Sequence, residues 1–87
     1  MPIVKLAGQI HSTKYAMMSK EIERKRIGRE IASIRKDMGM TQQDVSDKTG
    51  ILRPHIARVE QGKYNFGFDT LQTIADALDA DIRIVKR

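Results

Sequence analysis

The sequence predicts a mainly α-helical domain of four to five helices, followed by a short β-strand at the C-terminus. Apolar residues recur every three or four positions through much of residues 20–80, which is the period of an α-helix. Glycines stand where these periodic stretches stop, as expected at helix ends. From Asp81 to Lys86 the period changes to two, which indicates a strand. A chain of 87 residues forms one small domain.

Two short helices joined by a tight turn are expected in the middle of the chain. Helical patterns cover Thr41–Thr49 and Arg53–Gln61. Thr41 is a suitable N-cap, because its hydroxyl can accept a hydrogen bond from a backbone N–H two or three residues later. Gly50 can adopt a left-handed conformation at little cost, and Pro54 fits the first turn of the second helix. Two helices joined so closely form a helix-turn-helix.

A longer helix precedes this pair, and a further helix follows it. The long helix is expected to open at Ser19 or Lys20 and to end at Gly39, while Asp69 is the expected N-cap of a helix over Thr70–Leu78. The apolar face of the long helix is assigned to Ile22, Ile27, Ile31, Ile34 and Met38. Its charged face mixes both signs, and we favour a solvated face with ion pairs over a nucleic-acid contact.

The two ends of the chain have no helical period. Residues 1–19 are interpreted as an N-terminal tail of uncertain order, in which Ile3–Leu6 is a candidate strand. Residues 81–87 contain the predicted C-terminal strand, with Ile82 and Ile84 on one face. A lone strand needs a partner. The simplest partner is its own copy in a second subunit, which predicts a two-fold homodimer.

Composition excludes several classes of function. The chain has no cysteine, so it has neither a disulfide nor a thiolate metal site. No apolar run approaches the ~18 residues of a membrane helix, and we expect a soluble, cytoplasmic protein without a membrane partner. His11 and His55 lie in different contexts, without an acid or thiol at a useful spacing. No glycine-rich phosphate loop is present. We therefore expect no enzymatic activity, no metal and no cofactor.

Positive charge gathers where a second motif helix would face DNA. The net charge is +5, and residues 51–63 contain Arg53, Arg58 and Lys63 against Glu60 alone. A basic face attracts phosphate through counterion release. Many small soluble proteins are also basic, so charge alone leaves nucleic acid and an ordinary solvated surface about equally supported.

The combined spacing of these elements resembles the lambda-repressor-like, Cro/Xre-type helix-turn-helix family. The match covers about residues 27–79. It is carried by Ile31, Ile34, Arg35, Gly39-Met40-Thr41-Gln42, Val45-Ser46, Gly50-Ile51, Ile56, Val59-Glu60-Gln61-Gly62, Thr70-Leu71, Ile74-Ala75 and Ala77-Leu78. Ser46 departs from the usual alanine. The resemblance implies that residues 20–80 form a domain that binds double-stranded DNA.

Roles for individual residues follow partly from this resemblance. It implies base reading by the positions of Leu52, Arg53, Pro54 and Arg58, a phosphate contact by Gln42, and an ion pair between Arg35 and Glu60. Arginine is the commonest reader of guanine, and the N-terminal part of an inserted helix meets the bases. His55 is either an ordinary surface or core histidine or a DNA contact, and we include it among the base-reading candidates. Gln43 is a further candidate for the phosphate surface.

The loop over residues 62–68 offers two kinds of contact. Lys63 and Asn65 are the phosphate candidates. Phe66 and Phe68 could stack on bases, but we favour the reading in which one of them closes the core under the loop.

We infer a sequence-specific, dimeric transcriptional regulator that represses from a palindromic operator. The alternative is the antitoxin of a toxin–antitoxin pair, which would bind a toxin protein and its own operator. A dimeric structural scaffold, indifferent to DNA, is a third and weaker possibility. A neighbouring gene for a small toxin would distinguish the second from the first.

Overall fold

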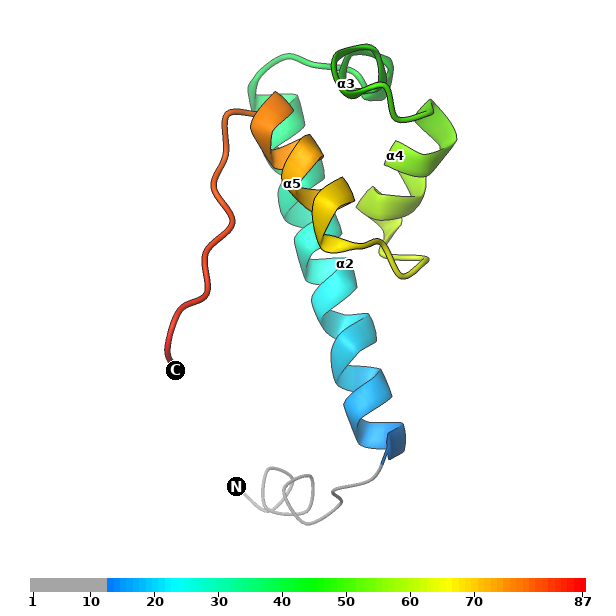
Figure 1. Cartoon of the computed structure of the whole chain (residues 1–87), viewed down its shortest axis with the longest axis vertical. Helices are drawn as coiled ribbons and strands as arrows, with labels where there is room; N and C mark the ends of the chain where they lie inside the picture. Colours follow the sequence, from blue (N-terminus) through cyan, green and yellow to red (C-terminus); the bar gives the residue numbers. More distant parts are fainter. Residues whose placement is uncertain (1–12) are drawn as a thin grey trace.

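The computed structural model describes residues 13–87, and four α-helices lie within them (Figure 1). Their bounds are α2 Thr13–Asp37, α3 Gln42–Thr49, α4 Arg53–Gln61 and α5 Phe68–Ala77. The predicted mainly α fold is confirmed, with boundaries of α3 and α4 within a residue of expectation. The candidate strand Ile3–Leu6 lies outside the described residues. Among the described helices, none has the length and apolar character to cross a bilayer.

The long helix α2 begins earlier than the sequence indicated. It starts at Thr13 rather than at Ser19 or Lys20, so part of the predicted tail is helical. The buried face of α2 also includes fewer residues than the sequence predicted, because Ile22 is 58% exposed whereas Ile31 is buried. These two residues are nine positions apart, or about two and a half helical turns, which places them on opposite faces. Met38, near the other end, is exposed as well.

The core lies where α2, α3, α4 and α5 meet. It consists of Ile31, Val45, Ile56, Val59, Ile74 and Leu78. Phe66 is partly buried against this core, as expected if one of the two loop phenylalanines closes it. Phe68 is instead 64% exposed. The exposure of Val45, Ile56 and Val59 is 0%, so the first motif helix and the second are fixed by one shared apolar cluster.

Local signals set the turn between α3 and α4. The Thr41 hydroxyl accepts a hydrogen bond from the Asp44 N–H at 3.0 Å, and the Asp44 carboxylate accepts one from the Thr41 N–H at 2.8 Å, which completes a capping box. Gly50 has a φ of 76°, the left-handed conformation that the turn requires. Pro54 lies in the first turn of α4, as predicted. Ser46 donates a hydrogen bond from Oγ to the Ile51 carbonyl oxygen at 2.6 Å.

Helices α2 and α4 cross at very short range. A Cβ atom built on Gly28 of α2 would lie 2.5 Å from the carbonyl oxygens of Val59 and Glu60 in α4. One built on Gly62, just after α4, would lie 2.7 Å from the backbone of Lys25. Only glycine at position 28 lets the two backbones approach this closely.

Helix α5 does not begin as predicted. Its N-cap is Gly67 and its first residue is Phe68, so Asp69 lies inside the first turn and is not the cap. An aspartate there still favours the helix, because its charge complements the positive end of the helix dipole. At the other end, Asp79 has a φ of 53° and the Ala80 N–H donates to the Ala75 carbonyl oxygen at 2.9 Å.

The predicted C-terminal strand was wrong: no strand occurs in residues 13–87. Residues 81–87 leave α5 as an irregular segment and return along one side of α2 (Figure 1). A strand needs a neighbouring strand for its backbone hydrogen bonds, and the described chain offers none. Ile82 is 37% exposed, while Ile84 and Val85 are 101% and 79% exposed.

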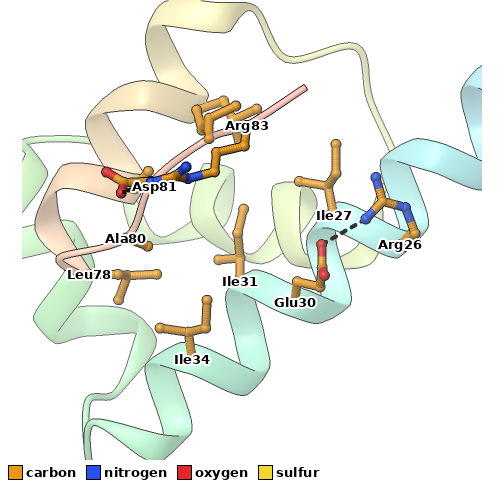
Figure 2. A pocket seen from close by; sticks show the side chains of 12 residues that line it. Arg26, Ile27, Glu30, Ile31, Ile34, Leu78, Ala80, Asp81 and Arg83 are labelled. Atoms are coloured by element: carbon orange, nitrogen blue, oxygen red, sulfur yellow. Dashed lines mark hydrogen bonds and ion pairs between the residues drawn. The ribbon is translucent and has the colours of Figure 1, made fainter. Parts of the chain in front are cut away.

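The start of this C-terminal segment borders a cavity of ≈ 330 Å³ between α2 and α5. Figure 2 shows Ile27, Ile31 and Ile34 of α2 on one side of it, with the segment from Ala80 to Arg83 opposite. Isoleucines and leucines make up most of the helical side of the cavity, and the ion pair between Arg26 and Glu30 of α2 also borders it.

Candidate nucleic-acid interface

The exposed surface at the start and along one side of α4 contains the five positions predicted to read bases, Leu52, Arg53, Pro54, His55 and Arg58. Leu52, at the N-cap, is 67% exposed, and Arg53, His55 and Arg58 are exposed as well. Ile56 lies on the opposite side of the helix and is completely buried. The amphipathic pattern of α4 therefore presents its polar side chains and its N-terminal turn to solvent, as insertion into a DNA groove would require.

A buried ion pair holds α4 against α2. Arg35 donates from Nε to Glu60 Oε2 at 2.7 Å and from Nη2 to Glu60 Oε1 at 3.0 Å. The two side chains are only 9% and 7% exposed. The pair implied by the family resemblance is thus present, with the two-point geometry in which arginine binds carboxylates best. Its hydrogen bonds raise the pKa of the Arg35 guanidinium, against the opposing effect of burial.

The same arginine also reaches the turn before α3. Arg35 Nη1 donates to the carbonyl oxygen of Met40 at 2.9 Å. This acceptor follows Gly39, whose φ of 71° ends the long helix. One guanidinium therefore ties the C-terminal end of α2 to both motif helices, because Met40 leads directly into α3 and Glu60 belongs to α4.

Gln42 connects this buried pair to the reading surface. Its Nε2 donates to Glu60 Oε1 at 3.0 Å, and its Oε1 accepts from Arg53 Nη1 at 3.4 Å. The sequence suggested only a phosphate contact for Gln42 and gave no sign of these internal partners. The side chain is half-buried, and one N–H of its amide remains for a ligand. Gln43 is exposed and donates to Asp47 at 2.9 Å.

The loop after α4 presents polar residues over an aromatic cluster. Lys63 and Asn65 are exposed, on the two sides of half-buried Tyr64. The Tyr64 hydroxyl lies 3.5 Å from His55 Nδ1, and the two rings meet edge to face with centroids 6.0 Å apart. Tyr64 also meets Phe66 edge to face at 6.2 Å. Sequence reasoning did not single out Tyr64, although its place between two phosphate candidates was a usable signal.

A helix-turn-helix family model of the Cro/C1 type matches residues 31–85, which is more than half of the chain. The chain belongs to this family. The resemblance predicted from the sequence is confirmed, and the family to which it points is one of DNA-binding transcriptional regulators. The family is a regulator family and not an enzyme family.

Two relatives support the assignment to the Cro/C1-type family. The chain is 30% identical over 59 residues to the immunity repressor protein of Bacillus phage phi105, a match covering 68% of this chain and 41% of the repressor. It therefore spans less than half of that relative's length. The chain is also 33% identical over 55 residues to an uncharacterised helix-turn-helix-type transcriptional regulator, y4dJ, of Sinorhizobium fredii; this match covers 63% of the chain and 71% of that protein.

A solved structure has the same fold. It is the restriction-modification controller protein C.AhdI from Aeromonas hydrophila, with a TM-score of 0.66 and 23% sequence identity. The alignment covers 69% of this chain and 91% of the controller protein. At this identity the comparison supports the helical fold alone.

Proposed function

We propose that this Cro/C1-type protein binds an operator in double-stranded DNA and represses transcription from it, with α4 in the major groove. One observation carries the proposal. The first turn of α4 is exposed, and Arg53 in that turn is linked through Gln42 to the buried carboxylate of Glu60. A reading side chain supported from the core loses less conformational freedom on binding than a free one.

The proposed contacts divide into two groups. Arg53 and Arg58 would read guanine through O6 and N7, Leu52 would contact a thymine methyl group, and His55 would contact a neighbouring base edge. The phosphate contacts are assigned to Lys63 and Asn65 after α4, and to Gln42 and Gln43 at the start of α3. Phosphate contacts fix the register of the protein on DNA, whereas base contacts supply the sequence preference.

Selection of binding sites from random duplex DNA with the purified protein tests the proposal, followed by measurements on variants. Arg53→Ala and Arg58→Ala should each weaken binding to the selected site by about 1–3 kcal/mol and relax the preference at one base position. Lys63→Ala should instead weaken binding to all sequences alike and reduce the salt dependence. The assignment of roles fails if Arg53→Ala and Lys63→Ala have the same effect on selected and random DNA.

The protein is further proposed to act as a homodimer. The C-terminal segment exposes Ile84 and Val85 directly after Ile82 and Arg83, which line the cavity between α2 and α5, and a second copy would cover the two exposed side chains. A two-fold dimer would place two α4 helices about 34 Å apart on a palindromic operator. Sedimentation of Ile84→Ser/Val85→Ser should then show a monomer, with Lys86→Ser as the control. A variant that remains dimeric would exclude this surface.

Neutralisation of a toxin protein, the alternative function, stays a prediction from the sequence. No feature of the described residues favours it over repression.

A further inference from the structure

The N-terminal part of α2 is a feature of this chain outside the region matched by the family. The family match starts at residue 31, whereas α2 starts at Thr13. Figure 1 shows this part of the helix, coloured blue, extending past α4 and α5. Most of the side chains described on this part, from Met18 to Arg26, are exposed, and the distribution of charge around the helix indicates which partner it fits.

One row of side chains on this projecting part faces the same side as α4. Lys20, Arg24 and Gly28 are spaced by four residues, so they lie above one another along the helix. Gly28 shows which side this row faces: a Cβ atom built on Gly28 would lie 2.5 Å from the α4 backbone. Lys20 and Arg24 therefore continue the α4 side of the helix beyond the point where α4 ends.

The projecting helix also lies directly beside the loop that carries the proposed phosphate contacts. Gly62 opens that loop, and its backbone is so close to Lys25 that an added Cβ would lie 2.7 Å from the Lys25 Cα and N atoms. Lys63 comes directly after Gly62 and is exposed. Lys25 on α2 and Lys63 in the loop thus belong to neighbouring parts of one surface.

Most carboxylates of this region lie on a different face. Glu23 and Glu30 are both held by Arg26, at 2.8 Å and 2.9 Å, in a row spaced by three and four residues. Arg26 and Glu30 border the cavity next to α5. Among the side chains that the structure describes, none forms an ion pair with Lys20, Arg24 or Lys25. Glu21 and Glu23 are the acidic residues between Lys20 and Lys25, and Glu23 is paired with Arg26, so the three cations keep a net positive charge on this surface.

From these observations we propose, in place of the solvated face that the sequence favoured, that Lys20, Arg24 and Lys25 bind DNA phosphates that flank the half-site read by α4. This inference rests on the proposed function. The helix from Lys25 back to Thr13 is about 18 Å long at 1.5 Å per residue. That length corresponds to about five base pairs at 3.4 Å each. DNA suits this surface better than an acidic protein does, because the adjoining loop carries Lys63 and Asn65, the residues proposed above to contact phosphates.

The test compares Lys20→Gln/Lys25→Gln with Lys36→Gln, an exposed lysine near the opposite end of the same helix. All three lysines are exposed, so helix content and melting temperature should not change. The probe is a duplex carrying the site selected by the wild-type protein, with flanks of ten base pairs. A second duplex has the same sequence with uncharged methylphosphonate linkages in the flanks. Affinity is measured against salt concentration.

On the ordinary duplex, the double variant should reduce the slope of log affinity against log salt by about 1.8, since each lost phosphate contact contributes about 0.9. Lys36→Gln should leave the slope unchanged. On the methylphosphonate duplex, wild type and double variant should bind alike. An unchanged slope for the double variant on the ordinary duplex would overturn the inference. An equal loss of affinity on both duplexes would also overturn it, because the lysines would then act through the overall positive charge of the protein and not through contacts with the flanking phosphates.

The two proposals can fail separately. If the selected site requires Arg53 but tolerates loss of Lys20 and Lys25, the operator function stands and the flanking contact is wrong. If the wild-type protein selects no site, the proposed function itself is wrong. If the double variant keeps the salt slope of the wild type on DNA but no longer captures an acidic protein that the wild type binds, the partner of this surface is that protein and not DNA.

Discussion

Substitution of Arg35 by alanine is the most direct test of how the motif helices are held. The substitution would leave Glu60 with its carboxylate 7% exposed and without its cation. Gln42 would remain as a hydrogen-bond donor to Glu60, but a neutral amide cannot balance a buried charge. The carbonyl oxygen of Met40 would lose its donor as well.

The magnitude follows from burial. Removing one partner of a buried ion pair costs about 3–5 kcal/mol, whereas a surface pair is worth less than ~1 kcal/mol. A domain of this size has a free energy of unfolding of about 4–13 kcal/mol. Arg35→Ala should therefore remove a large fraction of the stability. At about 4–8 °C per kcal/mol, the melting temperature should fall by more than about 12 °C.

Urea unfolding followed by circular dichroism measures the effect, with Arg26→Ala as the control. Arg26 also forms two ion pairs, but its side chain is 51% exposed, so its loss should change stability far less. A double-mutant cycle with Glu60→Ala should show that the two changes together cost less than their sum. Additive costs, or an Arg35→Ala variant as stable as the Arg26→Ala control, would refute the structural role of the pair.

Two further predictions concern stability. Gly28→Ala should lower the stability by about 1–3 kcal/mol, because the new methyl group would meet the α4 backbone at 2.5 Å, while Ser33→Ala at an exposed site should not. A stable Gly28→Ala variant would contradict the close crossing. The hydrogen bond from the Thr41 N–H lowers the pKa of the Asp44 carboxyl in the folded protein. The stability that this ionised carboxylate contributes is therefore complete above its unfolded pKa of about 3.9, and it is lost as the pH falls through the lower pKa of the folded state. Melting curves of Asp44→Asn should lack this acid-dependent loss; an unchanged pH profile would contradict it.

The motif itself could be predicted because its signals are local. The capping hydroxyl of Thr41, the left-handed turn at Gly50 and the proline in the first turn of α4 each act within a few residues. Such preferences do not depend on the rest of the fold. The exposure of Arg53 and Arg58 followed from the same local pattern, since burying one side of a short helix leaves the other in solvent.

The errors arose where distant contacts decide the outcome. The C-terminal segment alternates like a strand, but no neighbouring strand within residues 13–87 offers it hydrogen bonds. Ile22 is an exception, because that error was local: nine positions from Ile31, it lies on the opposite face of the helix by the helical period itself. The hydrogen bond between the Gln42 and Glu60 side chains joins residues 18 positions apart, and it forms only because α3 and α4 pack against each other. No local preference reports such a contact.

The crossing of α2 and α4 sets two surfaces at once. Gly28 and the Arg35–Glu60 pair fix the position of α4 on α2, and with it the exposed turn that carries Arg53. The same crossing fixes where the basic N-terminal part of α2 lies relative to the loop after α4. A variant at the crossing would therefore displace both surfaces together, and weak DNA binding by it would not identify a lost contact. Only substitutions of exposed side chains, such as Arg53→Ala or Lys25→Gln, separate reading and flanking contacts from the scaffold that positions them.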